Sequence, residues 1–171
     1  MRVSEILARR RVALGWMVVV ATLVLAHPTW STWRFGLTIA ALGEAVRVWA
    51  AGHLEKSREV TRSGPYRWTR HPLYVGSTIM ALGIVIASRS LVVALLAAIY
   101  KTSTLTAAIR TEEAFLSRTF GDTYDMYRDS RAEPMRRRFS LARAMRNREY
   151  RAMAGLAAGF ALLALKVIGY L

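Results

Sequence analysis

Residues 64–76 read Gly-Pro-Tyr-Arg-Trp-Thr-Arg-His-Pro-Leu-Tyr-Val-Gly, a cationic and aromatic stretch punctuated by proline and glycine. This stretch lies directly against the start of an apolar run at 73–87, which approaches the length of a membrane-spanning helix. An acidic stretch follows at 110–116, Arg-Thr-Glu-Glu-Ala-Phe-Leu, again next to an apolar run. If the two runs form a helical hairpin, both polar stretches meet at one membrane surface.

Apolar and charged residues are segregated along the chain. The 171 residues are 54% hydrophobic and carry a net charge of +14, yet the apolar residues gather in runs at 12–26, 33–51, 73–87, 91–109 and 152–170. This segregation is typical of membrane proteins. A helix needs about 20 residues to cross a bilayer, so the shorter runs would recruit flanking residues. We therefore predict an all-α membrane bundle of about five transmembrane helices, forming one domain over 1–171.

The basic residues predict the orientation. Of the 25 lysines and arginines, 20 fall within 2–11, 56–70 and 110–151, which share one side of the membrane if all five runs cross it. Basic residues in short loops stay in the cytoplasm, so the amino terminus and both polar stretches are expected there. The positive charge is then a topology signal. Nucleic-acid binding is not expected, because no aromatic and basic binding module accompanies the charge.

The first apolar run follows basic residues, as in a signal peptide. No small-x-small cleavage site precedes His27, however, so we expect this run to be retained as a span. The chain has no cysteine, which excludes disulfides, thiolate metal ligands and a cysteine nucleophile. His27 and His53 lack paired ligands nearby in the sequence, so no metal site is expected.

Three charged residues fall inside the predicted spans. Glu44 and Arg47 are three residues apart, on one helical face, and Lys101 lies in the middle of the fourth run. Charges at this depth are costly and usually point inward. Two interpretations remain open for Glu44 and Arg47: an interhelical salt bridge, or the polar floor of a cofactor cavity. Lys101 either pairs with Glu44 or lines the same cavity.

A basic segment occupies 135–150, before a last span at 151–171. Met135, Phe139 and Ala142 recur there at helical spacing among arginines. This pattern suits an interfacial helix held by anionic headgroups. A solvated basic linker is the alternative.

The ordered motifs resemble those of the isoprenylcysteine carboxyl methyltransferase family and its bacterial and phospholipid-methyltransferase relatives. The resemblance covers 64–134 and rests on three pieces: Gly64-Pro65-Tyr66, Arg70-His71-Pro72-x-Tyr74-x-Gly76, and Glu112-Glu113-x-x-Leu116-x-x-x-Phe120-Gly121-x-x-Tyr124-x-x-Tyr127. Each piece is weak alone. All of them in order, at the ends of a helical hairpin, form a more specific signal.

The resemblance implies an integral-membrane enzyme that binds S-adenosylmethionine in a cytoplasmic-side pocket and methylates a lipid-like acceptor from the bilayer. It also implies two sets of site residues. The expected cofactor-binding residues are Tyr66, Arg70, His71, Pro72, Leu73, Tyr74, Gly76, Glu112 and Tyr124. The expected catalytic residues are Arg110, which would orient an acceptor oxygen, and Glu113.

The residue chemistry is compatible with these roles. Arg70 is a forked donor for a carboxylate, and Glu112 or Glu113 would accept from an ammonium or a ribose. Gly76 would allow close approach of the cofactor to the backbone. In the plainer interpretation, the tyrosines form an interfacial aromatic belt and the glutamates pair with surface arginines.

Two other functional classes compete with the methyltransferase. Membrane sterol reductases resemble this family in their carboxyl-terminal half and bind a nicotinamide cofactor. A non-catalytic membrane protein with a vestigial pocket is the third class. The sequence leaves the acceptor head open among a carboxylate, a thiol and an amine.

The predicted topology can be tested directly. Five spans with the amino terminus inside put the carboxyl terminus outside the cytoplasm. A carboxyl-terminal reporter that is active only in the cytoplasm should therefore be silent, while the same reporter inserted after Arg138 should be active. Strong activity of the carboxyl-terminal fusion would mean that one run does not cross.

Overall fold

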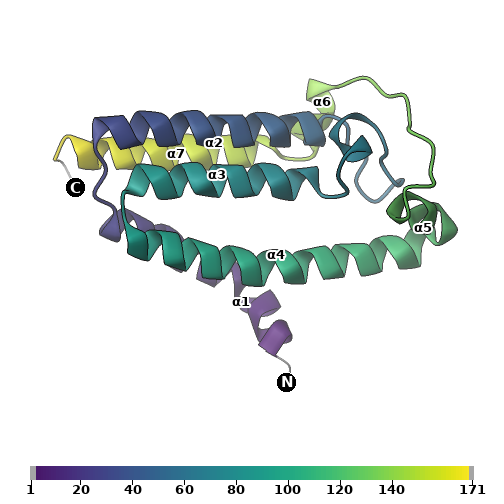
Figure 1. The fold of residues 1–171 in the computed structure, drawn as a ribbon, viewed down its shortest axis with the longest axis horizontal. Helices are drawn as coiled ribbons and strands as arrows, with labels where there is room; N and C mark the ends of the chain where they lie inside the picture. Colours follow the sequence, from purple (N-terminus) through teal and green to yellow (C-terminus); the bar gives the residue numbers. More distant parts are fainter. Residues whose placement is uncertain (1–2, 170–171) are drawn as a thin grey trace.

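The computed structural model describes residues 3–169, which form helices and connecting segments, with no strand in that range. Five long helices account for most of the chain: α1 (Val3–Leu25), α2 (Trp30–Ala51), α3 (Pro72–Ser88), α4 (Leu91–Phe120) and α7 (Tyr150–Val167). The shorter elements are η1 (Gly64–Arg67), α5 (Asp122–Arg128) and α6 (Leu141–Arg146). Helices α2, α3 and α7 lie side by side with α4 along one flank, and η1, α5 and α6 gather at one end (Figure 1).

The five long helices coincide with the five predicted runs, which confirms the all-helical membrane bundle. Helices α4 and α7 are each long and apolar enough to cross a membrane. The part of α1 at Gly15–Leu25 and α3 (Pro72–Ser88) are shorter apolar helical segments. Helix α2 is long enough but carries Arg34, Glu44 and Arg47. The largest departure from the predicted bounds is α4, which continues beyond residue 109 to Phe120.

The outer faces of the bundle are apolar. Trp16 on α1, Leu82 on α3, and Leu95 and Ile99 on α4 are more than half exposed. A soluble protein rarely leaves so many large apolar side chains uncovered. A lipid environment accommodates them, because every backbone group inside a helix is already hydrogen-bonded.

Helices α2 and α3 pack through facing glycines. Gly36 and Gly43 on α2 lie against Gly83 and Gly76 on α3, and all four are buried. A methyl group on Gly83 would lie 2.5 Å from the Gly36 carbonyl oxygen, far inside van der Waals contact. Small residues let helix backbones approach closely, which favours packing in a medium that offers no hydrophobic driving force.

A second cluster joins α1, α2, α3 and α7 at the end opposite to η1. Its buried members are Ala26, Ala40, Ala87, Phe160 and Leu163. Polar groups reinforce it: the Trp33 indole donates to the Phe160 carbonyl at 2.8 Å. Lys166 Nζ donates to the carbonyls of Leu23 and Val24 at the end of α1, where a cation complements the helix dipole.

The interpretation of 135–150 as one interfacial helix is wrong over most of its length. Only α6 is helical before α7 begins, and residues 133–140 have no regular secondary structure. Arg137 pairs with Glu59 at 2.6 Å, and Arg143 pairs with Glu55 at 2.7 Å, so these arginines face the loop after α2. The segment is also tied to the bundle, because the Ser140 N–H donates to the Gly52 carbonyl.

The glycine interface generates a stability prediction. Gly83→Ala should lower the free energy of unfolding by about 1–3 kcal/mol, because the added methyl forces two backbones apart. The matched control is Gly155→Ala on α7, where a methyl group meets no atom within 4 Å. That variant should be neutral or slightly stabilising, since alanine favours helix. Thermal unfolding in detergent measures both, and equal midpoints for the two variants would contradict this packing.

Candidate functional site

The predicted polar residues meet where α3 begins and the last turns of α4 pass. His71 is the residue before α3, and its side chain does not cap the helix. Instead, His71 Nε2 lies 3.0 Å from Glu113 Oε1, and His71 Nδ1 lies 3.9 Å from Glu112 Oε2. Arg70 Nη1 lies 3.3 Å from the same Glu113 oxygen. We call Arg70, His71, Glu112 and Glu113 the polar cluster.

The helical hairpin explains this convergence. Arg89 adopts a left-handed backbone conformation with φ of 50°, and Ser90 caps α4, so α4 turns back directly along α3. Proline at the first position of α3 suits a helix start, where its missing N–H is not needed. At 30 residues, α4 is about 45 Å long and exceeds a hydrocarbon core of about 30 Å. Its last turns therefore present Glu112 and Glu113 beyond the apolar layer.

Tyrosines from η1 and α5 support the cluster from the side. The Tyr127 hydroxyl donates to the Tyr66 carbonyl at 2.7 Å and ties α5 to η1. Burial raises the pKa of Tyr127 to about 12, with Tyr124 adding to the rise and Arg70 opposing it. Burial is the main cause that raises the pKa of Tyr66, and the negative charge of Glu112 adds to it. Burial likewise raises the pKa of Tyr124, with Glu113 as the second cause. All three phenols thus stay protonated at neutral pH.

An apolar groove runs from the polar cluster along the seam between α3 and α4. It has a volume of about 300 Å³ and is lined by His71, Tyr74, Val75, Thr78, Ile79, Leu105 and Ile109. The Tyr74 ring stacks on His71 with 5.7 Å between centroids and a 27° interplanar angle. Charged and apolar binding surfaces are therefore continuous. We call this space the α3–α4 groove.

Not every predicted site residue reaches this place. Gly76 faces α2, since a methyl there would lie 2.6 Å from the Gly43 carbonyl oxygen, so we leave Gly76 out of the site. Pro72 is buried at the helix start, and the Leu73 carbonyl accepts from Ser77 at 2.8 Å. Arg110 is exposed and makes no ion pair with another described residue.

The salt-bridge interpretation is confirmed in part, since Arg47 forms an interhelical bridge and a longer ion pair with Glu44 on its own helix. Arg47 Nε pairs with Glu149 at the start of α7 at 2.6 Å, whereas Glu44 is 3.7 Å away. Arg47 also donates to the Ser77 hydroxyl on α3. An interhelical bridge does exist, but its partner is Glu149. Within residues 3–169, Lys101 forms no ion pair with Glu44.

Sequence reasoning missed the roles of four residues in this region. Glu149 lies three residues before the last apolar run, a position that could have marked it as a partner for a charge inside the membrane. Leu105 and Ile109 are four residues apart and one or two turns before Glu113, so helical spacing could have identified them as groove residues. Tyr127 belongs to the quoted motif, but its hydrogen bond to the Tyr66 carbonyl could be seen only in the folded structure.

The donor set of the polar cluster suits a ligand that carries both an ammonium and a carboxylate. Glu113 is shared by Arg70 and His71, whereas the Glu112 side chain is 44% exposed and lies beyond hydrogen-bonding distance from His71. A carboxylate is thus available to an ammonium or to ribose hydroxyls. The Arg70 side chain, 39% exposed, keeps donors for a carboxylate. The Tyr74 ring beside them offers an aromatic face suited to a cation.

Known proteins similar to this chain fall into two groups. The "Nickel-cobalt-cadmium resistance protein NccN" of Alcaligenes xylosoxydans xylosoxydans is 32% identical over 141 residues, covering 73% of this chain and 64% of that protein. The "Cobalt-zinc-cadmium resistance protein CzcN" of Cupriavidus metallidurans is 33% identical over 133 residues, covering 68% and 60%. The "Protein-S-isoprenylcysteine O-methyltransferase" of Schizosaccharomyces pombe is 37% identical over 78 residues, covering 46% and 33%.

The matched regions span less than two thirds of the length of these relatives. No solved structure matches significantly. Among the side chains that the structure describes, no group of three or more from histidine, aspartate and glutamate is placed to hold a metal ion.

The family assignment rests on the longest shared region. Residues 11–123 match the family described as "Phospholipid methyltransferase", and this match includes α2, α3, α4 and the whole polar cluster. The similarity to the yeast methyltransferase points to the same group of membrane enzymes. With more than half of its residues matched, this chain belongs to the phospholipid methyltransferase family.

Proposed function

We propose that this protein is an integral-membrane methyltransferase that binds S-adenosylmethionine at the polar cluster and methylates an amphipathic acceptor entering from the lipid. The observation that carries the proposal is the continuity of the polar cluster with the apolar α3–α4 groove. The distribution of basic residues favours the cytoplasmic side for this site.

The four cluster residues divide the work of binding. Glu112 accepts from the ammonium or ribose, and Arg70 donates to the carboxylate of the methionyl part. Glu113 holds both Arg70 and His71 in position through contacts at 3.3 and 3.0 Å. When bound, S-adenosylmethionine supplies a methyl group activated on a sulfonium. Positioning of the acceptor next to it is then the main task of the protein.

The α3–α4 groove provides the surface for the acceptor. Its walls from Val75 to Ile79 and from Leu105 to Ile109 are largely apolar, so an alkyl chain remains among the helices. The acceptor head then lies at the end of the groove that adjoins His71 and Glu113. Arg110 directly follows Ile109 on α4, from where its flexible side chain can approach an acceptor oxygen. Water is scarce along this wall, which favours the meeting of an anionic head and a sulfonium.

Cofactor binding is the first test. Titration calorimetry of the purified protein in detergent should show saturable binding of S-adenosylmethionine and little binding of NADPH. His71→Ala and Glu112→Ala should each weaken the binding by about 1–3 kcal/mol, the usual cost of losing a hydrogen-bond partner to a charged group.

The matched control for Glu112→Ala is Glu133→Ala, which removes an exposed carboxylate outside the cluster. It should bind the cofactor as the unmodified protein does. Thermal unfolding of each variant checks that the fold is kept. Preferential binding of NADPH would instead favour a reductase, and normal binding by both cluster variants would show that the motif is structural.

Entry of the acceptor from the lipid is the second test. Methyl transfer to carboxylate, thiol and amine compounds, each with and without a long alkyl chain, should be faster for the long-chain member of the active pair. Leu105→Trp fills the α3–α4 groove. It should reduce the rate advantage of the long-chain compound at least about tenfold and leave cofactor affinity intact.

Leu95→Trp is the control for this substitution, because Leu95 is an exposed residue of α4 that does not line the groove. It should keep the preference for long chains. Equal or faster turnover of the short, water-soluble compounds by the unmodified protein would contradict lateral entry.

A further inference from the structure

A second groove lies on the opposite side of α2 from α3. It has a volume of about 530 Å³, and its lining comes from α2, from the segment before α6 and from α7: Ala41, Glu44, Ala45, Val48, Trp49, Phe139 and Met153. We call it the α2–α7 groove. None of these residues lines the α3–α4 groove, so the two spaces are separate.

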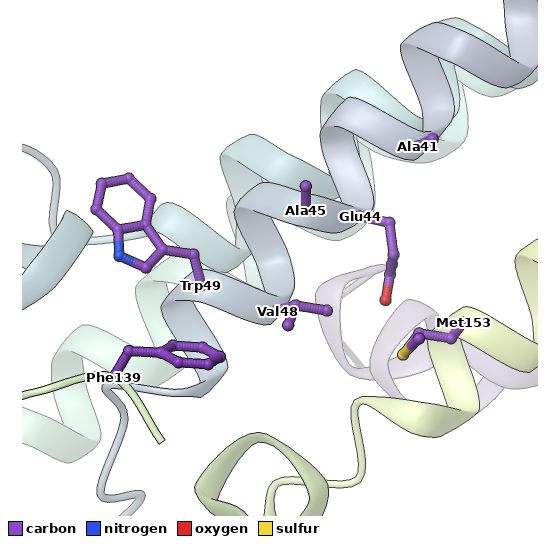
Figure 2. A pocket seen from close by; sticks show the side chains of 7 residues that line it. All are labelled: Ala41, Glu44, Ala45, Val48, Trp49, Phe139 and Met153. Carbon is purple, nitrogen blue, oxygen red and sulfur yellow. The ribbon is translucent and has the colours of Figure 1, made fainter. Parts of the chain in front are cut away.

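Glu44 is the single ionisable residue in this lining. Glu44 is only 7% exposed, and neither of its carboxylate oxygens has a hydrogen-bond partner among the described residues. Figure 2 shows the Glu44 side chain extending from α2 toward α7, where Met153 points back toward it. A buried carboxylate without a hydrogen-bond partner is costly, and this one is directed at the wall of a groove.

The nearest cation, Arg47, does not hydrogen-bond to Glu44. Arg47 Nε lies 2.6 Å from Glu149 and 3.7 Å from Glu44, beyond hydrogen-bonding distance. Its Nη1 donates to Ser77 and to the Leu73 carbonyl on α3. One guanidinium thus faces two carboxylates, and the closer one is Glu149. Among the described residues, no other lysine or arginine forms an ion pair with Glu44.

The other lining residues of the α2–α7 groove are apolar and indicate what kind of ligand it can bind. Ala41, Ala45 and Val48 form an apolar wall along α2, and Trp49 and Phe139 lie at one end of the groove. The volume is within the usual range of about 300–1,000 Å³ for small-molecule sites. A primary ammonium brings three donors and the missing positive charge, whereas an alcohol brings one donor and no charge. An alkyl chain matches the apolar wall.

We propose that the α2–α7 groove binds a long-chain amine, with the ammonium on the Glu44 carboxylate and the alkyl chain along α2. Met153 is an unbranched side chain that can swing aside to admit the ammonium. This site is independent of the polar cluster and takes no part in cofactor binding.

Photolabelling tests this site on the full chain in nanodiscs of phosphatidylcholine, a lipid that has no primary amine. The probe is dodecylamine carrying a diazirine in its chain, compared with the matched alcohol and the matched carboxylic acid. The amine should label peptides that contain Val48 or Met153, and unlabelled dodecylamine should compete. Glu44→Gln should reduce the labelling at least about tenfold, the effect of losing a charge-assisted contact.

Two further variants keep the result interpretable. Glu133→Gln removes a charge outside the groove and should label like the unmodified protein. Ala45→Phe fills the groove from an exposed position and retains Glu44, so it carries the test if Glu44→Gln does not fold. Equal labelling by amine, alcohol and acid, or undiminished labelling of both groove variants, would show a plain lipid-facing surface. Calorimetry with S-adenosylmethionine on the same samples reports separately on the polar cluster.

Discussion

The close approach of α2 and α3 is the constraint on which the other contacts depend. Each of the four interface glycines faces a partner carbonyl or backbone nitrogen so closely that a methyl would overlap it: on Gly76, for example, it would lie 2.6 Å from the Gly43 oxygen. Such contacts bring Cα–H groups against carbonyl oxygens, an interaction that recurs at helix interfaces. In lipid, this packing replaces the hydrophobic driving force available to a soluble bundle.

Arg47 extends this interface to the functional region. It lies one turn beyond Gly43 and reaches Ser77 and the Leu73 carbonyl on α3 as well as Glu149 at the start of α7. Because α3 is held at this level, His71 at its amino end is fixed relative to α4. Arg47 thus helps to position the polar cluster, although it contacts none of the cluster residues.

Much of this arrangement could be predicted from the sequence, and the rest failed for physical reasons. The apolar runs and the hairpin placed His71 near Glu112 and Glu113 correctly, because run length and short connections determine which helix ends meet. Gly76, which we expected at the cofactor, faces α2 instead, and glycines spaced by seven residues on both α2 and α3 indicated such a packing seam.

The basic segment at 135–150 was the other failure. Helical spacing was present, but periodicity in one segment does not reveal what the side chains find elsewhere in the fold. Arg137 and Arg143 lie against Glu59 and Glu55, and those ion pairs hold the segment close to the loop after α2. Long-range ion pairs of this kind override local helical propensity, and nothing in the local sequence indicates the partner.

The unequal lengths of α3 and α4 explain why the chemistry is placed at one end of the bundle. The 17 residues of α3 span about 26 Å, whereas the 30 residues of α4 span about 45 Å, so α4 overhangs the amino end of α3. The overhang carries Glu112 and Glu113 into a zone where charge is tolerated, and Leu105 and Ile109 remain one or two turns lower in the apolar layer. A ligand with a charged head and an apolar chain therefore satisfies both zones at once, which a uniformly polar or uniformly apolar ligand cannot do.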